Sequence, residues 1–211
     1  ARVSRWKRPA RGSAQGRKLY GRGLALGDRH IGHGESSAEI CLEPDGALRL
    51  TSSVRDQGVG AYTMHRQVAA EVLGIEPSSI QIEIKGTDTG PYDEGVRGAR
   101  GAHVEGRAVE RAAESLIASV KEQAAAHWNT SVEEVAWRAG RAWLTGDRRS
   151  MPLKKIAGIV KAPIKGYGHY HARKKPETYS FQALVADVEV DVETGAVRVV
   201  KLYFAYDVTK V

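Results

Sequence analysis

The residues whose types and spacing best suit ligand binding form two glycine-rich turns, and each turn precedes a helical pattern. The first turn consists of Gln57, Gly58, Val59 and Gly60, and the second consists of Gly98, Ala99, Arg100 and Gly101. Glycine lets the backbone adopt positive φ and brings bare amide N–H groups close to a ligand. The positive end of a helix dipole lies at the same place. Both turns are therefore suited to an anionic ligand with many ring heteroatoms.

Three further pairs of residues have side chains capable of chemistry. They are His30 with His33, His169 with His171, and Asp93 with Glu94. The histidine pairs lack acids or cysteines at ligand spacing, so the pattern does not favour zinc. The two acids are neighbours on a turn, and we expect both to point into water without a catalytic role. No Ser-His-Asp order with a nucleophile turn and no Walker phosphate motif is present in the sequence. The pattern assigns no catalytic residue and no metal ligand.

The first turn is predicted to connect a strand to a helix. Two extended runs, residues 37–42 and 47–54, are joined by Pro-Asp-Gly at residues 44–46, which is typical of a hairpin. Beyond the turn, apolar residues recur at helical spacing over residues 61–73. Gly74 fits the left-handed residue just past a helix end.

The second turn is predicted to begin a long helix over residues 102–128, because one apolar face continues through that segment. Residues 79–85 alternate isoleucine with polar residues, as a half-buried strand does. The other expected elements are a strand at 20–26, a loop at 27–34, a hairpin of 135–137 and 142–144, a short helix at 153–160, a Gly-rich loop with Tyr167, Tyr170 and Tyr179, and a ribbon of 181–192 and 196–208. Together they predict an α+β fold of mixed β-sheets with two main helices.

The net charge of +7 is concentrated in two blocks. Residues 1–18 hold seven basic residues and no acid, which leaves 25 Lys or Arg and 25 Asp or Glu in the rest of the chain. Residues 148–176 form a second block, with nine Lys or Arg and no acid. Such blocks are usually solvated or contact an acidic partner. Binding of an anionic cofactor, a partner subunit or a nucleic acid remains an alternative, although no recognisable nucleic-acid recognition module accompanies them.

Composition also indicates the cellular compartment of the protein. The single cysteine, Cys41, excludes an internal disulfide and lies between Ile40 and Leu42, as expected for a buried strand residue. No apolar run approaches the length of a membrane span, and the first residues lack the apolar stretch of a secretory signal. We expect a cytoplasmic protein.

Three segments, in fixed order, carry a family resemblance. The first turn and its helix match at Gly58, Gly60, Thr63, Gln67, Ala70, Leu73 and Gly74; the second turn matches at Gly98, Arg100, Gly106, Ala108 and Val109; and residues 181–208 supply a matching hairpin. Each turn alone is weak evidence, since such turns are common in α+β domains. In this order the segments resemble the molybdopterin-binding large subunit of the xanthine dehydrogenase and aldehyde oxidase family of molybdenum hydroxylases.

The chain departs from the family pattern at both turns. A glutamine that reaches the molybdenum centre in the family is replaced by Val59, and Gln57 lies two residues earlier. Three hydroxyl residues of the second turn are replaced by Ala99, Gly101 and Ala102. Main-chain donors survive such changes, whereas side-chain donors do not. The family's glutamate base lies far downstream of the matched hairpin, so no catalytic residue is carried over.

The charge pattern indicates a basic arm at residues 1–18, and the resemblance implies a partial molybdopterin-binding domain at residues 19–211. It implies that the glycines of both turns cradle the cofactor through main-chain N–H groups, with Gln57 and Arg100 as side-chain donors. It implies oxidative hydroxylation of an aldehyde or an N-heterocycle, with molybdopterin in the complete complex and with iron–sulfur and FAD groups on partner subunits. This segment alone is expected to be inactive. The alternative is a divergent, non-catalytic scaffold or subunit-interaction module, which Val59 and the lost hydroxyls favour.

Overall fold

The computed structural model describes residues 14–173 and 179–207 and divides the chain into two compact units. One unit comprises residues 31–176, and the other comprises residues 1–30 with 177–211. Residues 1–13 of the predicted basic arm lie outside the described residues. The boundary predicted after residue 18 remains a prediction. None of the described helices has both the length and the apolar character that crossing a membrane would require.

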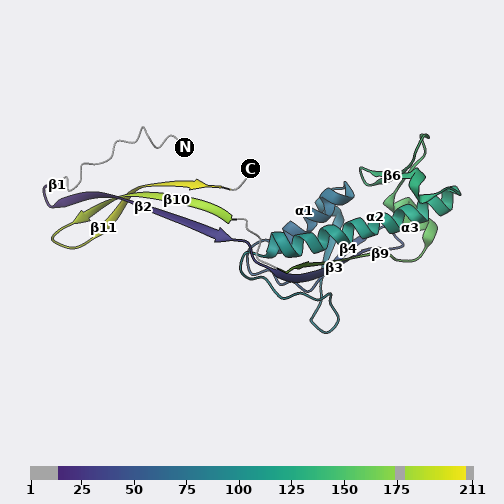
Figure 1. Ribbon diagram of the computed structural model, residues 1–211, viewed down its shortest axis with the longest axis horizontal. Coiled ribbons are helices and arrows are strands. Elements are labelled where there is room, and N and C mark those ends of the chain that lie inside the picture. The colour runs from purple at the N-terminus through teal and green to yellow at the C-terminus, as the bar shows by residue number, and fades with distance from the viewer. Residues whose placement is uncertain (1–13, 174–178, 208–211) are drawn as a thin grey trace. The chain divides into compact units, whose positions relative to one another are not determined.

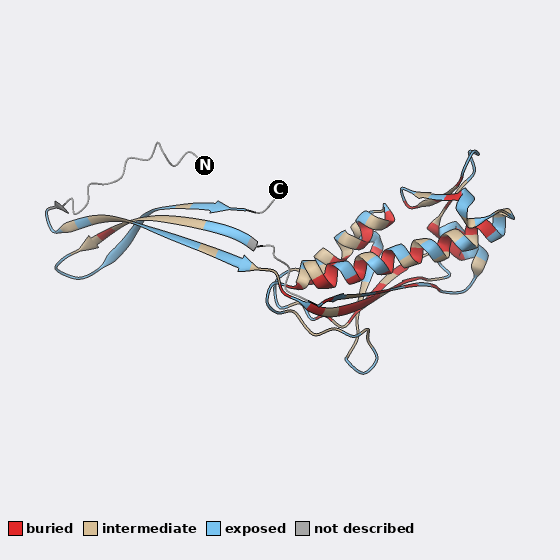
Figure 2. Cartoon of the chain, viewed as in Figure 1, coloured by how far each residue is buried: buried red, intermediate tan, exposed pale blue. Residues whose placement is uncertain are grey.

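The unit of residues 31–176 is built on a four-stranded sheet of order β5-β4-β3-β9. Its strands are β3 (Gly34–Leu42), β4 (Leu48–Ser52), β5 (Ile80–Ile84) and β9 (Ile164–Ala172). β3 pairs antiparallel with β4 and β9, while β4 and β5 are parallel. Helices α1 (Ala61–Leu73) and α2 (Gly106–Trp128) lie side by side over this sheet (Figure 1). Buried residues line β3 and the inner faces of both helices (Figure 2). The predicted α+β fold is confirmed.

The helix boundaries follow local backbone chemistry. α1 ends at Gly74, whose positive φ of 69° lets its amide donate to the carbonyl of Ala70, as the sequence predicts. α2 ends at Asn129, which also adopts a left-handed conformation. The remaining elements of this unit are two 3-10 helices (Pro77–Ser79 and Val132–Glu134), a π-helical turn (Gly101–Glu105), strands β6 (Val135–Arg138), β7 (Arg141–Leu144) and β8 (Ser150–Pro152), and helix α3 (Leu153–Val160).

The Gly-rich loop predicted around Tyr167, Tyr170 and Tyr179 is wrong, because Tyr167 and Tyr170 belong to β9 and Tyr179 begins a further strand. Gly166 and Gly168 are the reason. A Cβ atom on Gly168 would collide with the α2 backbone at Ala108 and Ala112, and one on Gly166 would collide with it at Ala112 and Leu116. Glycine in a strand often marks the close approach of another backbone. Here it lets α2 lie directly on β9, where Ala108 and Ala112 are fully buried.

The second unit is an antiparallel ribbon of order β1-β2-β10-β11. Its strands are β1 (Ala14–Gln15), β2 (Lys18–His30), β10 (Tyr179–Asp191) and β11 (Val197–Tyr206). The predicted hairpin is confirmed. The predicted loop at 27–34 is wrong for residues 27–30, which continue β2 against β10, and for Gly34, which begins β3. Glu189 joins the strands by accepting hydrogen bonds from Arg198, Lys18 and Tyr20, and these bonds lower its pKa to about 2.

Candidate functional site

The two glycine turns line one cavity of about 370 Å³. From the first turn and α1 come Gln57, Val59, Ala61 and Met64; from the second turn and the residues after it come Val96, Arg97, Gly98, Ala99, Gly101, Ala102 and Glu105. The structure thus brings together Gln57, Val59, Gly98, Ala99 and Gly101 of the predicted site. Gly58, Gly60 and Arg100 are not part of the lining. A larger cavity of about 470 Å³ lies on the ribbon and contains neither turn.

The first turn is closed by an acid of the protein itself. Asp56 Oδ1 accepts hydrogen bonds from the amides of Gly58, Val59 and Gly60 at 2.8, 2.9 and 3.2 Å. Burial opposes ionisation of Asp56, but the amide donors outweigh it and lower the pKa of this carboxyl below its usual value. The expectation of bare amide donors at this turn is therefore wrong. The positive φ values of Gly58 and Gly60, 93° and 79°, give the turn the shape that wraps the carboxylate.

The second turn keeps its amides available. Gly98 and Ala99 adopt positive φ values of 56° and 60°, and Arg100 N closes the turn by donating to the carbonyl of Arg97 at 3.1 Å. Among the described residues, no acceptor is found for the amides of Gly98, Ala99, Gly101 or Ala102. A π-helical turn, Gly101–Glu105, then leads into α2. Such turns are frequent at functional sites. This end of the cavity can receive a hydrogen-bond acceptor from a ligand.

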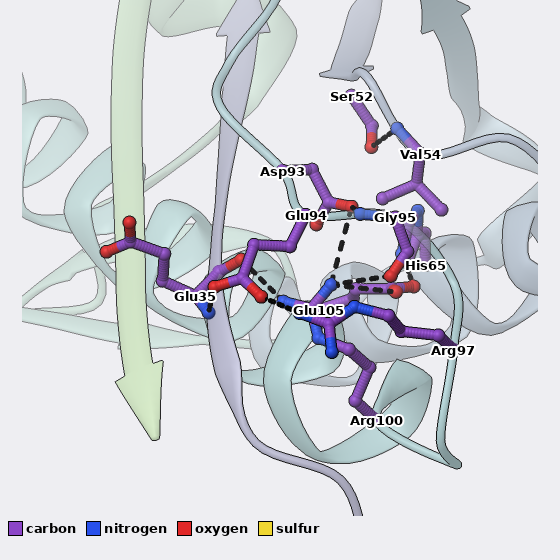
Figure 3. Close-up of polar contacts among 10 residues, drawn as sticks. All are labelled: Glu35, Ser52, Val54, His65, Asp93, Glu94, Gly95, Arg97, Arg100 and Glu105. Atoms are coloured by element: carbon purple, nitrogen blue, oxygen red, sulfur yellow. Dashed lines mark hydrogen bonds and ion pairs between the residues drawn. The ribbon is translucent and has the colours of Figure 1, made fainter. Parts of the chain in front are cut away.

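Arg100, a predicted ligand donor, has its side chain turned into the protein and is 1% exposed. Its Nη1 donates to the carbonyl of Gly95 at 2.7 Å, and its Nη2 donates to the carbonyl of Glu35 (Figure 3). The guanidinium therefore fixes the loop before the second turn to β3. Its assignment as a ligand-binding residue remains a prediction.

Arg100 belongs to a buried polar cluster of His65, Asp93, Arg100 and Glu105, whose side chains are each 1% exposed (Figure 3). Arg100 Nη1 lies 3.6 Å from Asp93 Oδ1 and 3.9 Å from Glu105 Oε1, and His65 Nε2 lies 3.7 Å from Glu105 Oε2. The expectation that Asp93 points into water is wrong, because Arg100 and the amide of Gly95 hold it inside. Glu94 is partly buried too: burial raises its pKa, but a hydrogen bond from the amide of Glu35 and nearby arginines lower it overall.

The sequence reading missed His65 and Glu105. Glu105 lies four residues before Val109 and therefore on the apolar face of the predicted long helix. A charged residue on a buried face is a signal that could have found it. His65 lies four residues after buried Ala61 on α1, so the same test applies to it.

The two histidines of the second pair share one acidic neighbour. His169 Nε2 and His171 Nδ1 each lie 3.6 Å from Glu35 Oε2, and His169 Nδ1 lies 3.1 Å from Ser37 Oγ. His30 ends β2, and His33 precedes β3. No group of three or more His, Cys, Asp or Glu within the described ranges is arranged to hold a metal ion.

Comparisons with known proteins agree on one family. A family model described as the molybdopterin cofactor-binding domain matches residues 1–211. The carbon monoxide dehydrogenase large chain of Afipia carboxidovorans is 26% identical, over 89% of this chain and 26% of that protein. The nicotine 6-hydroxylase large subunit of Paenarthrobacter nicotinovorans is 29% identical, over 81% of this chain and 22% of that protein.

The fold comparison gives the same result. The structure of a Cu,Mo-CO dehydrogenase in its carbon monoxide reduced state is similar with a TM-score of 0.77 and 25% identity. The match covers 90% of this chain and 26% of that one. The chain therefore spans about a quarter of the length of the relatives named above.

Proposed function

This chain belongs to the molybdopterin cofactor-binding domain family, and we propose that the cavity between its two glycine turns holds part of molybdopterin in a molybdenum hydroxylase. The observation that carries the proposal is that both turns, distant in sequence, line this one cavity. Its volume of about 370 Å³ is near the lower end of the ~300–1,000 Å³ typical of small-molecule sites. It suits one portion of the cofactor.

The residues of the cavity fit a cofactor with both an anionic group and polar ring edges. The amides of Gly98, Ala99 and Gly101 have no acceptor within the described segments and are suited to an anionic group. Gln57, from the first turn, also lines the cavity and adds a side-chain amide. Gly58 and Gly60 do not line the cavity, and Asp56 occupies their amides. Their contribution is the conformation of the turn that carries Gln57 and Val59.

In the complete enzyme, we propose, the bound molybdopterin supplies the redox chemistry for oxidative hydroxylation of an aldehyde or an N-heterocycle. This chain would bind and orient the cofactor. The relatives named nicotine 6-hydroxylase large subunit and aldehyde oxidoreductase molybdenum-binding subunit support that substrate class. Their names also support assembly with further subunits, and we propose iron–sulfur and flavin subunits as the partners. A cytoplasmic location stays a prediction.

A non-catalytic scaffold or subunit-interaction module is the second candidate. Val59 favours it, because this side chain is 69% exposed and lines the cavity where the family pattern has a glutamine. Valine neither donates nor accepts a hydrogen bond. The amides of the first turn also favour this candidate, because they already donate hydrogen bonds to Asp56.

Cofactor content of the protein assembled with its neighbouring subunits tests the proposal. Gly101→Val and Ala102→Leu would each place apolar atoms at the cavity wall, and a Cβ on Gly101 meets no atom closer than 3.6 Å. We expect both variants to fold and to lose most of the pterin and molybdenum of the parent. Gly158→Val on α3, where a Cβ meets open space, is the matched control and should keep both. Pterin contents equal to the parent's in both cavity variants would refute the site, and a parent free of pterin would favour the scaffold.

A further inference from the structure

One face of the ribbon formed by β2, β10 and β11 carries no charged residue. Directly paired residues of an antiparallel sheet lie on the same face, and side chains alternate between faces along each strand. The register therefore assigns to one face, called the apolar face below, Gln182, Leu184, Ala186, Val188 and Val190 of β10, Leu19, Gly21, Gly23, Ala25 and Gly27 of β2, and Val197, Val199, Leu202, Phe204 and Tyr206 of β11.

The apolar face is open to solvent over a large area. Val197, Phe204 and Tyr206 are 65%, 54% and 60% exposed, and the rings of Phe204 and Tyr206 stack with their centroids 5.5 Å apart. The ten residues of β11, at a rise of ~3.4 Å each, and three strands ~4.8 Å apart give this face an area of about 500 Å². An apolar patch of that size marks an interaction site. It supplies more than half of the ~800 Å² that each partner contributes to a standard interface.

The opposite face of the ribbon, near the turn between β10 and β11, pairs its own charges. Arg22 donates to both carboxylate oxygens of Asp187, and Glu189 accepts hydrogen bonds from Lys18 and Tyr20. The charges on that side are satisfied within the ribbon and suit contact with water. The apolar face offers no charge to a partner, so a nucleic acid or an acidic protein surface would be desolvated against it without compensation. The occupant must be apolar and uncharged.

The glycines of β2 leave space on the apolar face for side chains of an occupant. A Cβ on Gly23 would meet no atom within 4 Å, and one on Gly21 would meet only Val188, at 3.9 Å. Leu184 and Phe204 are among the residues that line a cavity of about 350 Å³ at the same face. Side chains from the inner faces of two packed sheets interdigitate in such spaces.

We propose that the apolar face is covered by another part of the same large subunit, through an uncharged apolar surface of that part. The matched region accounts for 26% and 22% of the two relatives named above, so most of the length of those proteins lies outside it. A partner in the same polypeptide is present at high effective concentration, so a face of this size is enough to hold it. The proposal rests on the proposed place of the chain in a complete enzyme and does not depend on cofactor binding.

Cysteine labelling measures whether the face is covered. Val199 lies on the apolar face and is 54% exposed; Val192, in the turn after β10, is 55% exposed and is the matched control. Maleimide labelling rates of Val199→Cys and Val192→Cys are measured by peptide mass spectrometry in the 211-residue chain and in the complete large subunit without its partner subunits. We expect Val199→Cys to react about 100-fold or more slowly in the complete subunit, because a covered site reacts only when the interface opens. The rate of Val192→Cys should differ by less than about 3-fold between the two proteins, because its exposure stays the same.

Equal labelling of Val199→Cys in the two proteins would overturn the proposal. Protection that appears only in the assembled enzyme would overturn it in favour of a partner subunit. Protection already present in the 211-residue chain would overturn it as well, and loss of that protection on dilution would identify a second copy as the occupant. The pterin content of the same complete subunit is measured alongside. A protected Val199→Cys in a subunit without pterin would support this proposal while refuting the proposed cofactor site, and the reverse result would separate them in the other direction.

Discussion

The two glycine turns line one cavity but use their backbone amides in opposite ways. In the first turn, Asp56 accepts hydrogen bonds from the amides of residues 58–60. In the second turn, the amides of Gly98 and Ala99 have no acceptor in the part of the chain that the structure describes. A glycine-rich turn before a helix is therefore not by itself an anion site. The residue that precedes the turn decides whether its donors are available.

The anchors of the two turns differ as well. Asp56 holds the first turn with a local carboxylate only two to four residues away from its donors. Arg100 holds the second turn through carbonyls of Gly95 and the distant Glu35. The first turn depends on one local contact, whereas the second depends on a buried cluster that joins the loop to β3 and α1. Substitutions at the second anchor should be the more damaging.

Arg100→Met should have the largest effect. It removes the cation beside two buried carboxylates, Asp93 and Glu105, and we expect a loss of about 3–5 kcal/mol in unfolding free energy. Urea denaturation measures this loss. Arg97→Met on the same loop removes only an exposed ion pair with Glu94 and should cost less than about 1 kcal/mol. Equal losses in the two variants would show that the buried cluster does not anchor the second turn.

The helices and hairpins were predictable because hydrophobic periodicity reports them directly. α1 with its terminal Gly74, and the β10–β11 ribbon, are examples. β9 was not predictable, because Gly166 and Gly168 resemble loop residues. Their role becomes clear only from the α2 backbone that packs against them. Pairing of β2 with β10 joins segments too far apart for any local pattern to reveal.

The candidate site was predictable in its turns and not in its polar contacts. Glycine spacing identified both turns, and the family resemblance placed them at one ligand. Which way a charged side chain points depends on partners from other elements. Arg100 faces inward because Glu35 and Gly95 offer carbonyls, and Asp93 is buried because Arg100 is there.

Asp56→Asn tests how the first turn is held, because its effect on stability should depend on pH. The folded-state pKa of Asp56 is lowered from a usual value of 3.8, so the ionised carboxylate stabilises the fold fully above that value. This contribution is lost as the pH falls through the lower folded-state pKa. Melting temperatures of parent and variant should therefore differ near neutral pH and converge in strong acid. Asp45→Asn, where the carboxylate accepts one amide in the β3–β4 hairpin, should show a smaller difference. A parent-minus-variant difference independent of pH would contradict the role of the charge.

The smallest effect is expected at Ala99, the non-glycine residue with positive φ in the open turn. A left-handed conformation costs an alanine roughly 1–2 kcal/mol, part of which is offset by its lower entropy in the unfolded chain. Ala99→Gly should therefore stabilise the protein by up to about 1 kcal/mol in urea denaturation. Ala102→Gly, three residues later in the π-helical turn, should instead destabilise it by up to about 1 kcal/mol, since glycine is unfavourable in helical backbone. Opposite signs would show that the second turn holds its open amides against backbone strain, as a binding turn does and a self-capped turn need not. Destabilisation by both substitutions would remove that argument for the second turn.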